Sequence, residues 1–323
     1  MLKTTLLRLL EALATLLCAT LLLFLLIRIA PGDPVQILLG RPGEAGVTDT
    51  AMQERQAAEL RERLGLEDPV AVQYGRWMER LLRLDLGESI HTGRSVGAEL
   101  AERLPATAAL ALAALAIQLA LGLGLGIASA LRAGGMSDQL IRIVCVVLAS
   151  TPAFVLGLGL LLVFAVRLGM YEISSAATLA RLWLPAATLG LIGAPQLIRV
   201  VRANLLSEFG QVYIVAARAR GLGRGRLALH ALRNSLASIV TVAALSLAAL
   251  ISGAVVIESL FAWPGVGKYA LDSIMLKDYP VIQGYALVMI ALMIGLHLAV
   301  ELVYALLDPR IRRQGRRIRH DAV

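Results

Sequence analysis

Four stretches of the chain run for more than twenty residues without an Asp, Glu, Lys or Arg: Leu104–Leu131, Ile143–Val166, Asn234–Ile257 and Tyr279–Val300. A helix of about 20 apolar residues crosses the hydrocarbon core of a bilayer. None of the four alternates polar and apolar residues, as the strands of an outer-membrane barrel would. A content of 58% hydrophobic and 17% charged residues also excludes an ordinary soluble domain. We therefore expect an all-α integral membrane protein.

Two further apolar stretches complete the expected bundle. Leu9–Ile27 carries only Glu11, and Leu182–Ile198 is short but can extend past Arg199, whose long side chain can reach the membrane interface. The first stretch follows two basic residues, as in a signal peptide. It is longer than a usual signal core, however, and IRIAPGDP follows in place of a small-residue cleavage site. We expect a retained first helix and six transmembrane helices in all.

Basic residues predict the orientation of these helices. If the N-terminus is cytoplasmic, the inner segments hold seventeen Lys and Arg residues, and the short outer loops hold four. Positive residues concentrate on the cytoplasmic side, so both termini are expected there. The net charge of +8 and the basic tail, residues 310–323, follow from the same bias. We expect membrane lipid, and not nucleic acid, as the partner of this tail.

The expected segments are a first helix at 1–30, an extracytoplasmic helical insertion at 31–103, a five-helix core at 104–309 and the tail. In the insertion, Thr50 and Gln53 form a capping box for a helix that reaches about Leu64. Asp68 is the expected N-cap of a second helix, with Pro69 at its first helical position. That helix carries an apolar face that either packs against the bundle or receives an outside partner: Val70, Tyr74, Trp77, Met78, Leu81 and Leu82.

The stretch FAWPGVGKYA, Phe261–Ala270, resembles the end of a phosphate-binding loop. Such a loop needs G-x-x-x-x-G-K-[ST] after a strand, because its backbone amides, lysine and hydroxyl bind phosphate and Mg²⁺. Here Ala262 occupies the first glycine position and Tyr269 the hydroxyl position, and the preceding apolar run is too long for a strand. The loop also lies on the outer side, where there is no ATP. We expect no ATP hydrolysis by this chain.

The same loop has two other interpretations. Pro264 and Gly265 form a tight turn that can project Phe261, Trp263 and Tyr269 outward, toward a delivered substrate or its binding protein. Alternatively the loop seals the bundle at the level of the lipid headgroups, where Trp and Tyr are common. Gln283 is a further candidate for the substrate path, and Gln118, Gln196 and Glu258 are others.

The cytoplasmic segment at about 204–233 is too amphipathic to span a membrane and too rich in glycine to form one straight helix. Gln211–Arg220 predicts a short helix that ends at Gly221, which can adopt the left-handed conformation. Gly223 and Gly225 are expected to extend the break, and a helix resumes at Arg226. A short helix below the membrane is suited to docking in a groove of another protein.

This segment resembles a known family. YIVAARARGLG and HALRNSL are similar to the EAA loop of bacterial ABC importer membrane subunits, with Ala216, Ala217 and Gly221 on the A-A-x-x-x-G core of the motif. The stretches IAPGDP, LGLEDPVAVQYGRW, LDLGES, FAWPGVGKYA, KDYPVIQG and LDPRIRR resemble the first permease of the dipeptide, oligopeptide and nickel group, in order over nearly the whole chain. Val215 replaces the glutamate of the motif, and Ser238 stands where many relatives have proline.

The resemblance implies a division of labour in the bacterial inner membrane. A second permease would complete the path, two ATPase subunits would bind ATP and Mg²⁺, and an extracytoplasmic binding protein would deliver the substrate. This chain would bind no cofactor itself. Peptides and nickel or metal chelates remain alternative substrates. The implied coupling residues are Tyr213, Ala216, Ala217, Arg218, Arg220, Gly221 and Leu222.

Other residues favour packing over chemistry. Gly122 and Gly126 have the spacing that lets helices approach closely, and Gly157 and Gly159 receive the same interpretation. His297 and Glu301 lie four apart on one helix face, which favours a hydrogen bond between helices over a metal site. The sequence shows no metal-binding cluster and no catalytic pair. An ion-coupled secondary transporter is the alternative function, and an intramembrane enzyme ranks last.

Overall fold

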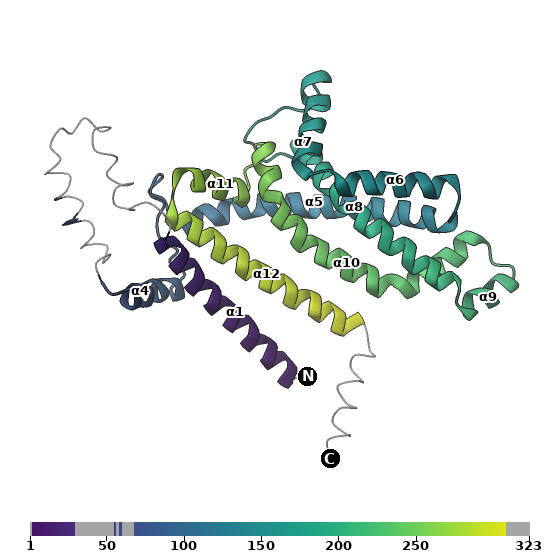
Figure 1. Ribbon diagram of the computed structural model, residues 1–323, viewed down its shortest axis with the longest axis horizontal. Helices are drawn as coiled ribbons and strands as arrows, with labels where there is room; N and C mark the ends of the chain where they lie inside the picture. The colour runs from purple at the N-terminus through teal and green to yellow at the C-terminus, as the bar shows by residue number, and fades with distance from the viewer. Residues whose placement is uncertain (1, 30–54, 56–57, 60–67, 308–323) are drawn as a thin grey trace, which may run out of the picture. The chain divides into compact units, whose positions relative to one another are not determined.

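The computed structural model describes residues 2–29, 55, 58–59 and 68–307, and in this part helices joined by turns and loops make up the regular structure, apart from a single β-bridge between Glu88 and Ser95 (Figure 1). The chain forms two compact units. Unit 1 comprises Met1–Arg103 and Tyr269–Ile294, and unit 2 comprises Leu104–Lys268 and Gly295–Val323. The helices are α1 (Leu2–Ile29), α4 (Val70–Leu82), α5 (Val96–Leu131), α6 (Met136–Ser150), α7 (Ala153–Leu161), the π-helix η1 (Leu162–Arg167), α8 (Leu179–Phe209), α9 (Val212–Ala219), α10 (Arg224–Leu260), α11 (Val266–Leu276) and α12 (Tyr279–Leu307).

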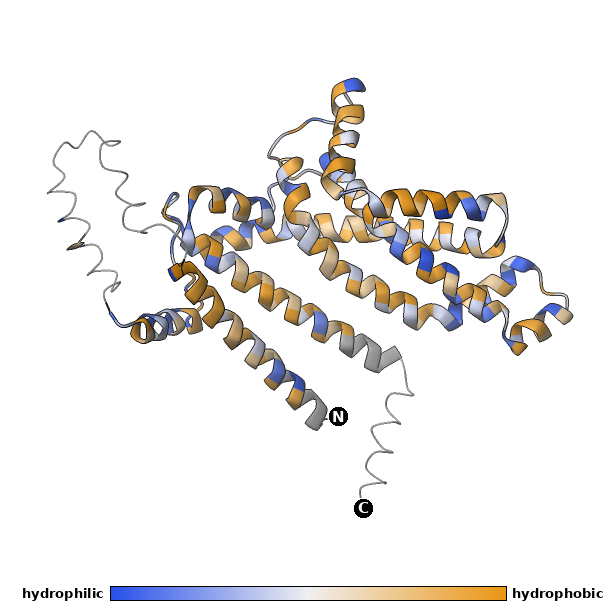
Figure 2. Cartoon of the chain, in the orientation of Figure 1, coloured by the Kyte–Doolittle hydropathy of each residue, from blue (hydrophilic) through white to orange (hydrophobic). Residues whose placement is uncertain are grey.

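Five helices of the described part are long and apolar enough to cross a membrane: α1, α5, α8, α10 and α12. Figure 2 shows that apolar residues dominate the length of α5, α7 and α12, while hydrophilic residues gather near helix ends and in loops. The pair formed by Met136–Ser150 and Ala153–Arg167 passes the same test together, so the count rises to six if this pair is one span.

The predicted span over Ile143–Val166 is divided between two helices. The chain bends by 102° between α6 and the segment that follows. Pro152 lacks a backbone N–H, and a residue before proline is forced out of the helical region. Thr151 accordingly has φ −89° and ψ 123° and ends α6. Pro152 is visible in the sequence, but the long apolar run around it favoured the prediction of one span, and the bend was not predicted.

The core of unit 2 lies between α8 and its neighbours α5, α7 and α10. One apolar cluster includes Leu110, Leu184, Ile257 and Phe261, and a second includes Leu197, Leu205, Ile214 and Leu227. A methyl group on Gly122 would overlap Leu197, and one on Gly126 would lie 2.7 Å from Val201. These two glycines therefore allow α5 to approach α8 closely, as predicted.

The prediction for the other glycine pair is only half right. A methyl group on Gly157 would lie 2.5 Å from the side chain of Leu260, so this glycine lets α7 approach the end of α10. Gly159 is exposed, and a methyl group there would meet nothing within 4 Å. The two residues lie on different sides of α7 because they are two positions apart on a helix.

In unit 1, α4 packs its aromatic face on α1. Phe24 of α1 lies 5.4 Å from the ring centroid of Tyr74 and 5.9 Å from that of Trp77. The hydroxyl oxygens of Thr20 and Tyr74 are 3.0 Å apart and share a hydrogen bond. The aromatic part of the predicted apolar face therefore packs on α1, whereas Val70 and Leu82 of that face are exposed.

The start of α4 differs by one residue from the prediction. Pro69, with φ −52° and ψ 140°, is the N-cap itself, and no side chain caps the helix. Asp68 instead forms an ion pair with Arg76, and its backbone carbonyl accepts a hydrogen bond of 2.7 Å from the side chain of Gln73. Of the helix predicted from Thr50 and Gln53 to Leu64, only residues 55, 58 and 59 are described, and these are helical, while the basic tail lies outside the described residues.

Candidate functional site

The short helix α9 is held in place by one buried side chain. Ile214 is fully buried and belongs to the same apolar cluster as Leu205 of α8 and Leu227 of α10. Ala217 and Leu222 pack against this cluster from either end of the turn. Because α9 has only eight residues, it is too short to be stable by itself and depends on this packing.

The C-terminus of α9 confirms the predicted role of Gly221. This glycine has φ +83°, and its N–H donates to the Arg218 carbonyl at 2.9 Å. The N–H of Leu222 donates to the Ala217 carbonyl at 3.3 Å. These two bonds form a Schellman motif, which satisfies carbonyls at the helix end and needs a residue that tolerates positive φ.

The predicted restart of the helix is two residues late. α10 begins at Arg224, with Gly223 as its N-cap, so Gly225 lies inside the first helical turn and does not extend the break. The first four N–H groups of a helix have no partner within it, and a glycine there costs less than in the interior. The connection between α9 and α10 is therefore shorter and tighter than the glycine content suggested.

The other face of α9 is apolar and exposed. Val212 is 82% exposed and Val215 is 54% exposed, and Ala216 and Ala219 are exposed beside them. The spacing of these four residues is that of one helix face. Arg218 and Arg220 are exposed too. The valine that replaces the glutamate of the EAA motif therefore continues an exposed apolar stripe, which we call the α9 stripe: Val212, Val215, Ala216 and Ala219.

Tyr213 links α9 to the end of α8. Its hydroxyl donates a hydrogen bond to the Glu208 carboxylate. Burial raises the pKa of the Tyr213 phenol, and the bond to Glu208 raises it further, so the phenol stays protonated and keeps its donor. A groove of about 860 Å³ lies beside this corner and is lined in part by Arg132, Arg218 and Arg224.

Phe261 and Trp263 of the loop 261–268 point inward, contrary to the first of the two interpretations, in which they project outward. Phe261 is fully buried and Trp263 is 2% exposed. The indole N–H of Trp263 donates to the carbonyl oxygen of Ala106 at 2.9 Å, and the backbone N–H of Trp263 donates to the Glu258 carbonyl at 2.8 Å. Pro264 is half-buried and Gly265 is buried. Burial of a large aromatic surface overrides the exposure that the tight turn suggested.

The Gly-x-Gly-Lys order of this loop surrounds a carboxylate of the same chain. Glu258, at 0% exposed, accepts a hydrogen bond of 3.0 Å from the backbone N–H of Lys268 and one of 2.5 Å from the Thr107 hydroxyl. A methyl group on Gly265 would overlap the Glu258 carboxylate, and one on Gly267 would lie 2.9 Å from it. The glycines thus let the first turn of α11 approach an anion, as in a phosphate loop, but the anion is Glu258.

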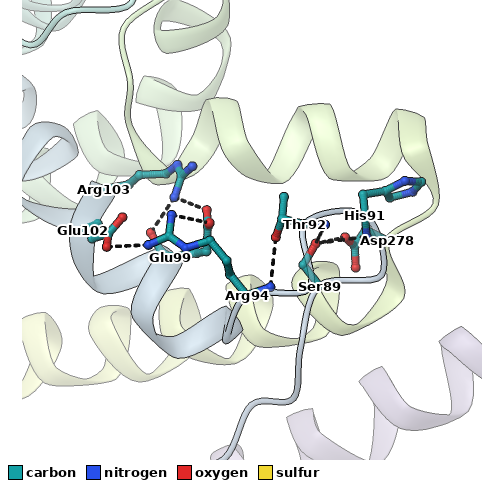
Figure 3. Close-up of polar contacts among 8 residues, drawn as sticks. All are labelled: Ser89, His91, Thr92, Arg94, Glu99, Glu102, Arg103 and Asp278. Atoms are coloured by element: carbon teal, nitrogen blue, oxygen red, sulfur yellow. Dashed lines mark hydrogen bonds and ion pairs between the residues drawn. The ribbon is translucent and has the colours of Figure 1, made fainter.

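In unit 1, two of the motifs noted in the sequence meet. Asp278 of KDYPVIQG is 2% exposed and accepts hydrogen bonds from the Ser89 hydroxyl at 2.6 Å and the Ile90 N–H at 3.2 Å (Figure 3). A ring nitrogen of His91 lies 2.9 Å from the carbonyl oxygen of Leu276. A methyl group on Gly284 would lie 2.6 Å from Val96. LDLGES therefore folds onto the corner before α12, a contact that sequence reasoning missed although both motifs were noted.

Charged residues at the start of α5 extend this cluster. Glu99, only 2% exposed, pairs with Arg94 at 2.8 Å and with Arg103 (Figure 3). The Arg103 guanidinium lies 4.2 Å from the centre of the Tyr269 ring. Burial raises the pKa of the Tyr269 phenol, and the Glu99 charge adds to the effect. Tyr269 thus contributes to the packing of unit 1, and Gln283 is half-buried in α12.

The remaining candidates lie apart. Gln118 is buried and donates a hydrogen bond of 2.9 Å to the Ser246 hydroxyl, which joins α5 to α10. Gln196 is exposed on α8, and His297 is exposed on α12. The side chain of Glu301 lies outside the described residues, so its predicted bond with His297 stays a prediction. No group of three His, Cys, Asp or Glu side chains in the described part could hold a metal ion.

Family models match both parts of the chain. The family described as "Binding-protein-dependent transport system inner membrane component" matches residues 122–313. The model of the N-terminal part of such a membrane component matches residues 1–111. The first match contains α9, the loop that surrounds Glu258 and Asp278, and the second contains α1, α4 and Ser89, the partner of Asp278.

Relatives agree with these matches. The di/tripeptide transport system permease protein DppB of Pseudomonas aeruginosa is 34% identical over 91% of this chain and 94% of its own length. The glutathione transport system permease protein GsiC of Pectobacterium atrosepticum is 34% identical over 94% of this chain and 97% of its own length. A solved structure of the MetNI methionine ABC transporter covers 65% of this chain and 96% of its own, with 17% identity and a TM-score of 0.52, and so shares the fold.

Matches over almost the whole chain account for the apolar helices. They replace the alternatives of an ion-coupled transporter and an intramembrane enzyme, because the family is a transport component and not a catalytic subunit. The chain belongs to the binding-protein-dependent transport system inner membrane components and is a multi-pass permease of an ABC importer.

Proposed function

We propose that this permease imports short peptides, in the size range of dipeptides and tripeptides. The relatives that share about a third of their residues with nearly the whole chain are named for di/tripeptide and for glutathione transport, and glutathione is itself a tripeptide. Nickel, the alternative left open by the sequence motifs, has no comparable support.

The observation that carries the coupling part of the proposal is the geometry of α9. Ile214 and the bonds around Gly221 hold the helix on one side, and the α9 stripe faces outward on the other. An exposed apolar face on a short helix, fixed at both ends, is the form of a helix that docks in a groove. We propose that an ATPase subunit supplies this groove and binds the ATP and Mg²⁺.

The complete importer would also contain a second permease, a second ATPase subunit and an extracytoplasmic binding protein. ATP-driven closure of the ATPase subunits would push α9, and the packed contact of Ile214 would pass this movement to α8 and α10 as a rigid-body displacement. The role of Phe261 and Trp263 would then be to hold the outer end of α10 in place while this movement occurs.

Peptide uptake tests the proposal. The chain is expressed with its second permease, ATPase and binding-protein subunits in a bacterial strain that lacks its own peptide importers. Accumulation of a labelled tripeptide, abolished when the chain is omitted, is the expected result. Accumulation of nickel without accumulation of peptide would refute the peptide assignment.

A change in the α9 stripe tests the coupling part separately. Val215→Glu restores the residue type of the EAA motif, whereas Val215→Lys places the opposite charge at the same exposed position. Since the stripe is proposed to dock in an apolar groove, Val215→Lys should lower both peptide uptake and the amount of ATPase subunit that co-purifies. Val72→Lys, an exposed valine of α4, is the matched control and should leave ATPase co-purification unchanged.

A further inference from the structure

A groove between α6 and α8 contains arginines that the coupling function does not use. Its volume is about 400 Å³, and Arg142, Arg199 and Arg202 line it together with apolar side chains. Arg142 and Cys145 come from α6, and Ile198, Arg199 and Arg202 come from α8. We propose that this groove binds the phosphate headgroup of an anionic phospholipid from the cytoplasmic leaflet.

The base of the groove is fixed by a buried ion pair. Asp138 is fully buried, and its two carboxylate oxygens accept hydrogen bonds from Nε and Nη2 of Arg202, both at 2.8 Å. The same carboxylate accepts bonds from the Ser129 hydroxyl and, at 2.9 Å, from the Gly134 N–H. Arg202 is therefore already neutralised, and its role is to tie α6 to α8 at a fixed distance.

The other two arginines carry the charge that a ligand would meet. Arg142 and Arg199 are both exposed, and neither forms an ion pair or a hydrogen bond with a residue of the described ranges. Two guanidinium groups that face one groove without a carboxylate between them match the oxygens of a phosphate, which guanidinium binds in bidentate geometry.

The position of these arginines along the helices favours a lipid over a soluble phosphate. Arg142 directly precedes the uncharged run 143–166, and Arg199 directly follows the uncharged run 182–198. Both therefore lie where the apolar surface of the helices ends, on the side that the arginine bias assigns to the cytoplasm. Lipid phosphates lie at this depth, and basic pockets between helices on this side can bind anionic headgroups.

The apolar walls of the groove are suited to the glycerol backbone and acyl chains of a phospholipid. Ile141, Cys145, Val146 and Ile198 line it next to the arginines. Beyond the groove, the surface of α6 is apolar and open, with Ile143 60% and Val147 58% exposed. A glycerol backbone and acyl chain would cover this surface, whereas inorganic phosphate would leave it bare. The apolar wall thus selects a phospholipid as the occupant.

The test is lipid retention by the full chain in detergent, measured by native mass spectrometry. Phosphatidylglycerol is compared with phosphatidylcholine of the same acyl chains. The groove variant is Arg142→Gln/Arg199→Gln, and the matched control is Arg132→Gln/Arg226→Gln, which removes the same charge on the same side but outside the groove. We expect the wild type to prefer phosphatidylglycerol and the groove variant to retain about thirtyfold less of it, the scale for two charges near a membrane surface.

Several outcomes would overturn the proposal. One is equal retention of phosphatidylglycerol by the wild type and the groove variant, and another is an equal loss in the control variant. Displacement of the lipid by the same concentration of soluble glycerol phosphate would show a phosphate site without a role for the acyl chain. If the groove variant does not fold, Arg142→Lys/Arg199→Lys keeps both charges without the bidentate geometry. It should retain phosphatidylglycerol better than phosphatidylcholine, and loss of that preference in a folded protein would also refute the site.

Discussion

At the scale of single residues, the loop that most resembled a nucleotide site turns out to be a structural corner. Two hydrogen bonds stabilise this corner. The indole of Trp263 donates one, and the carboxyl group of Glu258 accepts the other. A short motif is defined by the backbone geometry that its glycines permit, and this geometry accepts a carboxylate of the same chain as readily as a phosphate. The motif alone therefore does not tell which group its backbone binds, and here that group is Glu258, which precedes the motif in the sequence.

The indole hydrogen bond of Trp263 can be tested without removing the ring. Trp263→Phe loses the donor to the Ala106 carbonyl and keeps most of the aromatic packing, so it should cost about 1 kcal/mol of stability and lower the midpoint of thermal unfolding in detergent. Peptide uptake per folded molecule should change little, because the ring is buried and cannot contact a delivered substrate. Trp183→Phe is the control, since Trp183 packs on Phe164 and Tyr171 through its ring. Normal stability with lost uptake would instead support a contact role for the loop.

At the scale of elements, α9 is the part that the sequence predicted best. The glycine that ends it lies at φ +83°, and open space surrounds its Cα, so the constraint is conformational and not steric. A residue other than glycine in this region costs about 1–3 kcal/mol, and a β-branched one is the least tolerated.

Gly221→Val should therefore displace the C-terminal turn of α9. Peptide uptake should fall, and less ATPase subunit should co-purify with the permease. Gly223→Val is a close control, because Gly223 also has open space around it but adopts φ −67° and ψ 157°, which valine accepts. Gly221→Asn should recover part of the activity, since asparagine tolerates the left-handed region better than valine. Equal behaviour of the two valine variants would show that the conformation of Gly221 is not needed.

Other elements show what local pattern cannot predict. The length and apolarity of α5, α8, α10 and α12 fixed their positions, because a membrane helix needs only its own backbone bonds and an apolar surface. The inward turn of Trp263 and the contact between Ser89 and Asp278 depend on residues far apart in the sequence, whereas the bend at Pro152 has a local cause. Predictions based on a single stretch of chain contain no information about such partners.

At the scale of the whole molecule, the chain is a transport permease component and not a catalytic subunit. We expect the purified permease to hydrolyse no ATP. In the stretch with the order of a phosphate-binding loop, the Lys268 N–H donates to the buried Glu258 carboxyl group and the Val266 N–H donates to the Thr107 hydroxyl, so a phosphate there would find these donors occupied and the space filled. The isolated chain with Lys268→Ala should also hydrolyse no ATP, and the complete importer with this change should keep its full ATPase activity.

The measurement is phosphate release by each preparation. A variant of the ATPase subunits that binds ATP without hydrolysing it is the control for contamination. Hydrolysis by the isolated permease that disappears in Lys268→Ala would place a nucleotide site in this chain and contradict the role of Glu258.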